Sequence, residues 1–218
     1  MDGHSRQRIA RLYQGHLQRG YVRGKLASDP VYAAVAARID GTSLPLLDIG
    51  CGIGLLGQYL HAQGHDRPYL GLDHDPRKIA AGQRAVQRAG LDAVMRLQQA
   101  DVAELPPQQG HVALLDVLHY LPAARQPTLL RDAARHLSPQ GLLIIRNVLR
   151  EANWRFHATR VEEFFLRASG WIPGGAQHYP SADEIRASLE QAGLEVHFEP
   201  LRGRTPFNSY LVVARHPH

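Results

Sequence analysis

The chain has 218 residues, 44% of them hydrophobic and 21% charged, which is typical of a globular protein long enough to bury a sizeable core. Its formal net charge is +5, and its single cysteine, Cys51, excludes an internal disulfide. No apolar run approaches the ~18 residues of a membrane span, and the N-terminus lacks the apolar core of a signal peptide. We therefore expect a cytoplasmic protein.

Basic residues are dispersed along the chain, with one denser group near the N-terminus. No recognised nucleic-acid-binding motif accompanies this group, so a solvated face is favoured over an RNA-binding groove. The 13 histidines form no cluster with cysteines at zinc-type spacing, since the chain has one cysteine, so no metal is expected. The denser group consists of Arg6, Arg8, Arg11, Arg19, Arg23 and Lys25.

Residues 1–41 have a helical pattern and precede the first predicted strand. Asp29-Pro30 opens a second helix, because proline is favoured at the first helical position. We expect this N-terminal cap to pack on the sheet edge or over a ligand, with Tyr21 and Lys25 on one helical face toward the pocket. The predicted apolar positions are Ile9, Leu12, Tyr13, His16 and Leu17 in the first helix, and Val31, Val35 and Ile39 in the second.

Between residues 44 and 148 the chain alternates between strand and helix patterns. This alternation predicts an α/β fold with a parallel sheet covered by helices on both faces. The last strand of this region is apolar nearly throughout, as expected of a strand that is covered on both sides. The predicted strands are 44–49, 69–72, 93–98, 111–115 and 142–148, and the helices between them are 55–63, 77–88 and 123–137.

The alternation breaks after residue 149. Residues 150–180 contain both tryptophans and no strand pattern, so we expect a lid over the functional end of the sheet, suited to a flat or apolar acceptor. Ser181 is a favourable helix cap, and the last two strands, 194–198 and 209–215, have no helix between them. We predict one domain over residues 1–218 that ends in an antiparallel hairpin.

The loop that follows the first strand reads Asp48-Ile49-Gly50-Cys51-Gly52-Ile53-Gly54. Glycine is needed where the backbone adopts positive φ or approaches a ligand closely, and the next helix turns its free N–H groups toward this loop. Gly52 and Gly54, together with Gly57, also satisfy the dinucleotide pattern Gly-x-Gly-x-x-Gly, in which a pyrophosphate lies on the helix N-terminus. Asp48 argues against that ligand, because a carboxylate repels pyrophosphate. It favours a ligand with an ammonium and a sulfonium, namely S-adenosylmethionine (SAM).

Acidic residues stand at or just beyond four predicted strand ends: Asp48, Asp73, Asp101 and Asp116. Ligands of open α/β sheets bind beyond the carboxyl ends of the strands, so these side chains are candidate ligand contacts. Asp73 lies 19 residues after Gly54 and suits the two hydroxyls of a ribose. A ribose is present in both SAM and NAD, so Asp73 does not distinguish between them.

The ungapped Asp48-x-Gly50-x-Gly52-x-Gly54 motif resembles the first motif of the class I SAM-dependent methyltransferases. The resemblance covers residues 44–148 closely and the C-terminal hairpin loosely. It implies the Rossmann-like seven-stranded sheet of that family, with SAM as methyl donor and S-adenosylhomocysteine as product. It places Gly50, Cys51, Gly52 and Gly54 near the methionine portion, Asp73 on the ribose, Asp101 with Val102 at the adenine, and His74 against the purine.

The segment Asp116-Val117-Leu118-His119-Tyr120-Leu121 follows the fourth strand, where this family places residues near the transferred methyl group. Because imidazole changes its charge near neutral pH, His119 is our candidate base, with Tyr120 and Asp116 as alternatives. Arg146 is a charge in an apolar strand and needs an anion. Two readings remain open: Arg146 binds an acidic substrate, or it pairs with an acid of the chain.

A narrower resemblance concerns methyltransferases from aryl-polyene pigment gene clusters. It rests on Tyr21-x-x-x-Lys25-x-x-x-Asp29-Pro30, on the segment 116–121, and on Thr205-Pro206-Phe207-Asn208. It implies an aromatic acceptor, bound to an acidic acyl carrier protein that the basic N-terminal region meets. Two alternatives stay open beside a methyltransferase of small molecules: an NAD(P)-dependent oxidoreductase, and a non-catalytic module that binds SAM or nucleic acid.

Overall fold

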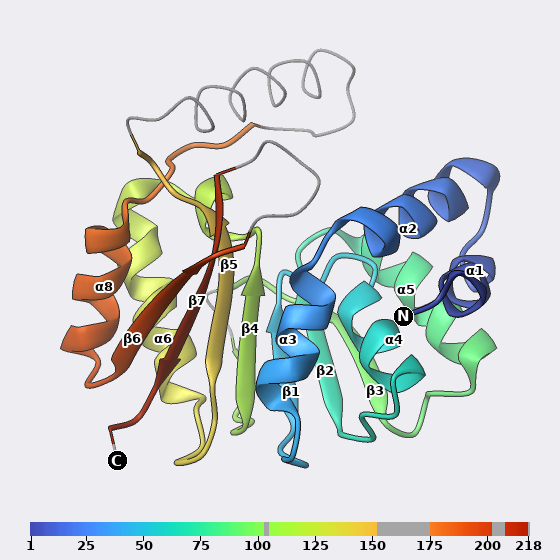
Figure 1. Ribbon diagram of the computed structural model, residues 1–218, viewed down its shortest axis with the longest axis horizontal. Helices are drawn as coiled ribbons and strands as arrows, with labels where there is room; N and C mark the ends of the chain where they lie inside the picture. The colour runs from blue at the N-terminus through green and yellow to red at the C-terminus, as the bar shows by residue number, and fades with distance from the viewer. Residues whose placement is uncertain (103–104, 152–174, 202–207, 218) are drawn as a thin grey trace.

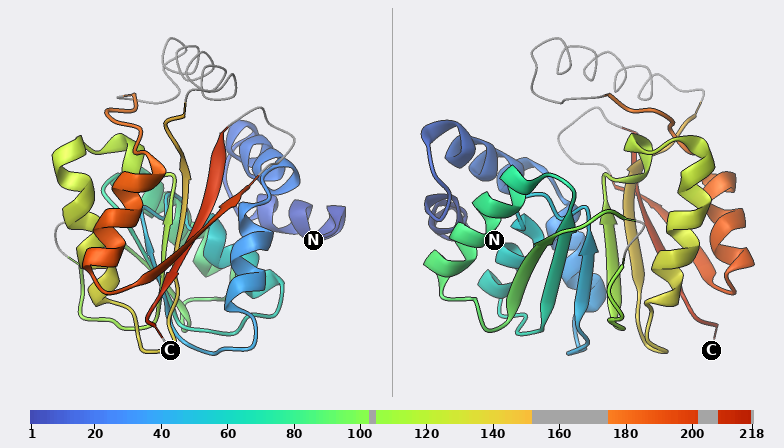
Figure 2. Two further views of the ribbon diagram at one scale, coloured as in Figure 1. Left: turned by 60° about the vertical axis from the view of Figure 1, so that its left-hand side comes forward. Right: turned by 180° about the vertical axis from the view of Figure 1, so that it is seen from behind.

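The computed structural model describes residues 1–102, 105–151, 175–201 and 208–217. They form a seven-stranded sheet between two layers of helices (Figures 1 and 2). The strand order is β3-β2-β1-β4-β5-β7-β6, in which β7 runs antiparallel to the other six strands. This confirms the predicted methyltransferase-like sheet and its hairpin. The strands are β1 (Leu46–Ile49), β2 (Tyr69–Asp73), β3 (Met95–Gln99), β4 (His111–Leu115), β5 (Leu143–Val148), β6 (Glu195–Pro200) and β7 (Ser209–Arg215).

Each face of the sheet has its own hydrophobic core, because successive strand residues point to opposite faces. Ile144 of β5 packs in the core under α1–α5, whereas Ile145 packs in the core under α6 and α8. The helices are α1 (Gly3–Arg11), α2 (His16–Ser28), α3 (Val31–Ile39), α4 (Leu55–Ala62), α5 (Pro76–Ala89), α6 (Gln126–Arg135) and α8 (Ala182–Gln191), with 3₁₀ turns η1 (Leu118–Tyr120) and η2 (Ala123–Arg125).

The N-terminal region contains three helices instead of the two that we predicted. The chain turns at Gly15, whose φ is 75°, and α2 starts directly after it. Ile9 and Tyr13 are buried as predicted, but Leu17 is 79% exposed. The prediction that residues 9–17 share one apolar face is therefore wrong, because the turn at a glycine redirects the chain.

The C-terminal part matches the prediction where the structure describes it. Ser181 and Glu184 form a reciprocal capping box at the start of α8. The predicted helix 123–137 is shorter, because η2 precedes α6 and α6 ends at Arg135. Most of the predicted lid, residues 152–174, lies outside the described residues.

The parallel strands β1 to β5 end at one edge of the sheet, the upper edge in Figure 1, and α2 lies at this same edge. Backbones with unusual φ occur here. Gly50, Gly52 and Gly54 have φ between 59° and 79°, and Asp116 is the one non-glycine residue among those described with positive φ, at 62°. Strained backbone at a strand end is common at functional sites, so this edge is the candidate site.

Candidate active site

The glycine loop crosses the end of β2 and leaves open space beside Gly52. The N–H groups of Gly50 and Cys51 both donate to the carbonyl of Leu72, at 2.7 and 2.8 Å. A Cβ on Gly50 would lie 2.4 Å from a Val117 methyl carbon, whereas a Cβ on Gly52 would meet no described atom within 4 Å. Gly50 is thus required for packing, and Gly52 borders a surface on which a ligand can lie.

The N-terminus of α4 adds a partial positive charge to the loop. Gly54 is its N-cap residue and offers no side-chain cap, so the first N–H groups of α4 remain available to a ligand. Gly57, the last glycine of the dinucleotide-like pattern, has a packing role instead. A Cβ there would lie 2.6 Å from the Met95 methyl carbon, so this glycine allows α4 to approach β3.

Asp73 ends β2 and supports the loop. Its Oδ2 accepts from the Gly52 N–H at 2.9 Å, and its Oδ1 accepts from the Asp75 N–H at 2.9 Å. A carboxylate has about four acceptor sites, so about two remain for a ligand's hydroxyl groups. The predicted ribose contact therefore fits, but Asp73 also shapes the loop, a second role that the sequence did not reveal.

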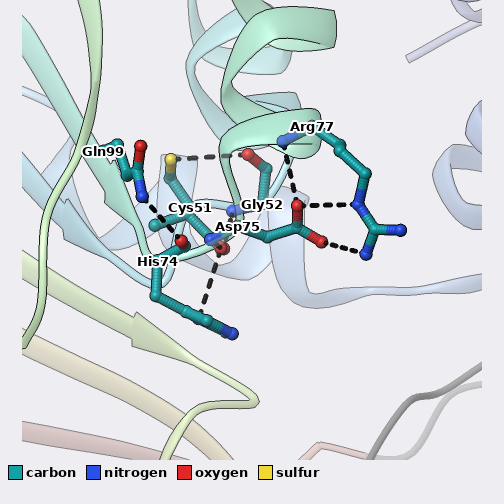
Figure 3. Close-up of polar contacts among 7 residues, drawn as sticks. Cys51, Gly52, His74, Asp75, Arg77 and Gln99 are labelled. Atoms are coloured by element: carbon teal, nitrogen blue, oxygen red, sulfur yellow. Dashed lines mark hydrogen bonds and ion pairs between the residues drawn. The ribbon is translucent and has the colours of Figure 1, made fainter.

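The residues after Asp73 are shown in Figure 3. His74 presents an exposed imidazole, and its carbonyl accepts from the Gln99 side chain at 3.4 Å. Asp75 caps α5 and pairs with Arg77 at 3.0 Å, and hydrogen bonds from Arg77 lower the pKa of Asp75 to about 2. The Cys51 thiol lies 3.7 Å from the Gly52 carbonyl oxygen, and burial raises its pKa well above the ordinary value, consistent with a packing role.

Asp101 and Val102 follow β3 at the same edge of the sheet. The Asp101 side chain is 60% exposed and lies 3.5 Å from the guanidinium of Arg125, while Val102 packs against the core under α6 and α8. An exposed acceptor next to a partly buried aliphatic side chain suits an adenine. That assignment stays a prediction.

Asp48 is a buried carboxylate with one unused oxygen. It is 2% exposed, and its Oδ2 accepts a short hydrogen bond from the Tyr69 hydroxyl. Its Oδ1 has no partner among the described residues. Burial raises the pKa of Asp48 to about 7, against the opposing effect of the Tyr69 hydrogen bond. A buried acceptor without a donor, next to the glycine loop, fits a cationic group such as the ammonium of SAM.

Four charged residues at the ends of β4, β5 and α2 form one network. Arg146 pairs with Asp116, with its other terminal nitrogen 3.7 Å from Asp29, and Lys25 lies 2.7 Å from Asp29 and 3.9 Å from Asp116. Burial opposes the charge of Arg146, but Asp116 and Asp29 outweigh it and raise its pKa. Of the two readings of Arg146, the structure supports the internal pair. Tyr21, one turn before Lys25, is 43% exposed.

His119 is held at the opposite face of β5 from Arg146. It is 7% exposed, and its Nδ1 lies 2.9 Å from Asn147 Oδ1. The Asn147 amide nitrogen donates to the Val148 carbonyl at 2.8 Å, which orients the amide so that its oxygen faces the imidazole. The hydrogen-bond network therefore assigns the proton to Nδ1 and leaves a lone pair on Nε2. This is the tautomer that a base acting through Nε2 requires.

Two tyrosines border the imidazole. The Tyr179 ring is stacked on it at 5.6 Å and 10°, and the Tyr120 ring lies at 4.1 Å and 45°. The N–H groups of Gln177 and His178 both donate to the His119 carbonyl, which ties the segment before α8 to η1. His119 is thus fixed by both its ring and its backbone.

Asn147 is the residue of this cluster that sequence reasoning missed. It stands next to Arg146, whose charge drew attention, and the period-2 alternation of a strand places it on the opposite face, toward α6. A buried amide in an apolar strand needs a partner as much as a charge does. That signal was present in the sequence.

No group of three or more His, Cys, Asp or Glu side chains in the described part of the chain could hold a metal ion. Among the described helices, none has the length and hydrophobicity needed to cross a membrane.

Comparisons with known proteins agree with this geometry. Residues 46–141 match the family model described as a methyltransferase domain. A ubiquinone biosynthesis O-methyltransferase from Azorhizobium caulinodans is 30% identical over 185 residues, which cover 78% of this chain and 70% of that protein. The chain belongs to the class I SAM-dependent methyltransferases. A second ubiquinone biosynthesis O-methyltransferase, from Methylobacterium nodulans, is 27% identical over 80% of this chain and 74% of its own.

Solved structures share the fold. Magnesium protoporphyrin IX methyltransferase from Synechocystis PCC 6803, with bound S-adenosylhomocysteine, has a TM-score of 0.70 at 20% identity, covering 99% of this chain and 94% of that one. Mitomycin 7-O-methyltransferase has a TM-score of 0.69 at 24% identity, covering 91% of this chain and 56% of that one. Membership of this family overturns the oxidoreductase alternative.

Proposed function

We propose that this methyltransferase methylates a hydroxyl group of a small aromatic acceptor, and that His119 removes the hydroxyl proton. The His119–Asn147 pair is the observation that supports this best, since it combines a buried imidazole, a fixed tautomer and neighbouring tyrosine rings. The relatives named O-methyltransferases support oxygen as the acceptor atom.

The residues of the loop and strand ends fit SAM, which when bound supplies a methyl group on a positively charged sulfur. The unused Oδ1 of Asp48 suits the ammonium, and the open side of Gly52 suits the methionine backbone. Asp73 has acceptor sites left for the ribose hydroxyls. The residues proposed to hold the cofactor are Asp48, Gly50, Cys51, Gly52, Gly54, Asp73, His74, Asp101 and Val102, with Tyr21 and Lys25 from α2.

His119 acts in this proposal through Nε2, which accepts the proton of the acceptor hydroxyl. Asn147 keeps accepting from Nδ1–H in both charge states of the ring, so the imidazole does not have to turn during the step. Tyr179, stacked on the ring, stabilises the imidazolium by a cation–π contact. Asp116 is a weaker candidate, because Arg146 and Lys25 outweigh its burial and lower its pKa.

The first test is His119→Ala, assayed with SAM and a panel of phenols, catechols and naphthols while S-adenosylhomocysteine release is measured. The expected result is a fall in kcat of ~10²–10⁴, the usual range for general acid–base catalysis. The affinity for S-adenosylhomocysteine should not change, because the imidazole meets the acceptor. A variant that keeps near-normal kcat would remove His119 from the mechanism.

The second test concerns Asn147. Asn147→Leu removes the acceptor of the Nδ1 proton, so nitrogen NMR of the labelled imidazole should show His119 losing its preference for the Nδ1–H tautomer. Asn147→Asp keeps an acceptor oxygen and should retain that preference. Asn208→Leu is the control, since Asn208 is also a buried amide, with hydrogen bonds to Leu149 and Glu151. Wild-type protein with the proton on Nε2 would contradict the assignment.

The finer predictions on the acceptor and the location remain part of this proposal. An aryl-polyene acceptor and a carrier-protein-bound acceptor rest on the resemblance alone, and the relatives found are named for ubiquinone biosynthesis. A cytoplasmic location is likewise proposed.

A further inference from the structure

The turn between α1 and α2 makes a hydrogen bond to the glycine loop. Tyr13 lies in this turn and is 1% exposed, and its hydroxyl donates to the Ile53 carbonyl at 3.1 Å. Ile53 stands between Gly52, which borders the open surface, and Gly54, the N-cap residue of α4. The bond therefore connects the N-terminal cap to the middle of the loop that is proposed to hold the cofactor.

Two arginines hold the turn that carries Tyr13. Arg19 of α2 donates from Nε to the Tyr13 carbonyl at 2.9 Å, and Arg88 of α5 donates to the Leu12 carbonyl at 2.7 Å. Carbonyl groups at the C-terminus of a helix lack partners within the helix, and basic side chains commonly bind them. Arg19, from the basic N-terminal group, thus helps to fix the position of the tyrosine.

The glycine loop is supported from several sides. A Cβ on Gly82 would lie 2.7 Å from the Ile53 carbonyl oxygen, so α5 packs closely against this carbonyl. On the side of β2, Asp73 accepts from the Gly52 N–H at 2.9 Å. The bond from the α1–α2 turn differs from these two supports, because it comes from outside residues 46–141, which match the methyltransferase family model.

We propose that Tyr13 is a positioning residue for the cofactor, and that its hydroxyl holds the glycine loop in the conformation that binds SAM. This inference rests on the proposed cofactor site. Three glycines of the loop have positive φ, and glycine gives the backbone many accessible conformations. A hydrogen bond that favours one of them raises the fraction of protein ready to bind, and the apparent affinity scales with that fraction. Tyr13 acts through the Ile53 carbonyl, without contact to the ligand.

The test is Tyr13→Phe, which removes the hydroxyl and keeps the buried ring. An ordinary hydrogen bond contributes about a factor of five to an equilibrium constant, so calorimetry should show about two- to fivefold weaker binding of S-adenosylhomocysteine. In stopped-flow measurements the association rate constant should carry this loss, because a smaller fraction of the protein is ready to bind. The dissociation rate constant should not change, because the contacts of the bound ligand stay the same.

Tyr59→Phe is the matched control. This tyrosine of α4 is also buried, at 5% exposure, and its ring packs against Tyr32. The Tyr59→Phe variant should bind S-adenosylhomocysteine as the wild type does. An equal loss of affinity in Tyr59→Phe would overturn the proposal, since the loss would then follow from the removal of a tyrosine hydroxyl elsewhere in the protein.

Two other outcomes overturn the role of Tyr13. A loss that appears as faster dissociation would indicate direct contact between the hydroxyl and the ligand. Unchanged affinity in Tyr13→Phe would show that the loop does not depend on this bond. Gly52→Ala separates the second outcome from failure of the cofactor site. Weaker binding in Gly52→Ala alone would overturn only the role of Tyr13, whereas wild-type binding in both variants would also remove the glycine loop from the cofactor site.

Discussion

Asp48 provides the sharpest prediction, because its charge state links cofactor binding to pH. The buried carboxylate has one oxygen hydrogen-bonded to Tyr69 and one without a described partner, and its pKa is about 7. An ammonium group at the unused oxygen favours the ionised form. Binding of S-adenosylhomocysteine, which carries this ammonium, should therefore strengthen as pH rises through neutrality.

The size of the effect follows from the pKa. A group with a pKa of about 7 is about one-tenth ionised at pH 6 and about nine-tenths ionised at pH 8. If only ionised Asp48 pairs with the ammonium, the affinity should rise about tenfold over this interval, about 1.4 kcal/mol. Asp48→Asn should bind more weakly at pH 8 and show no such rise.

The assay is calorimetry at pH 6, 7 and 8 in two buffers that differ in their enthalpy of ionisation. Near pH 7 the wild type should release about half a proton on binding, since Asp48 is about half protonated there. Tyr69→Phe removes a hydrogen bond that lowers the pKa of Asp48, so the midpoint of the rise should move to higher pH. A wild-type affinity that does not change with pH would refute this reasoning, as would the same rise in Asp48→Asn.

Two further predictions concern stability and the loop. Burial and, to a smaller extent, the charge of Arg67 lower the pKa of His111 from 6.5 to about 4. Protonation of His111 therefore favours the unfolded chain. The free energy of unfolding should fall by up to about 3 kcal/mol as pH drops from 6.5 to 4. Urea unfolding at several pH values across this range measures this loss of stability. The His111→Gln variant should lose less stability than the wild type. The same dependence of unfolding free energy on pH in both proteins would contradict the assignment. Gly52→Ala and Gly64→Ala each place a Cβ in open space at positive φ, so each should lose about 1–2 kcal/mol of stability. Only Gly52→Ala should weaken S-adenosylhomocysteine binding, and equal affinities in the two variants would remove Gly52 from the cofactor site.

The sheet could be predicted from sequence because its signals are local. The alternation of apolar strands with helices and the missing helix before the last strand were enough to predict the parallel sheet and the antiparallel hairpin. The turn at Gly15 was missed, because the apolar spacing from Ile9 to Leu17 fits a continuous helix. In the structure the chain turns at Gly15, and Leu17 lies on a separate helix with its side chain exposed.

The site could be predicted only in part, because its contacts join distant segments. The acid at each strand end was visible, but the pairing of Arg146 with Asp29 joins residues that are far apart in the chain. The hydrogen bonds that Asp73 accepts from the N–H groups of Gly52 and Asp75 depend on backbone geometry that the spacing of residues does not encode. Asn147 could have been found, because a buried amide needs a partner.

The central claim is that a cofactor on the glycine loop presents its sulfur to the His119 side of the sheet. A crystal structure with bound S-adenosylhomocysteine tests this most directly. We expect the ribose hydroxyls within hydrogen-bonding distance of Asp73, the ammonium at Asp48, and the sulfur facing Nε2 of His119 with space for an acceptor between them. A ligand whose ribose makes no contact with Asp73, or whose sulfur faces away from His119, would contradict the account.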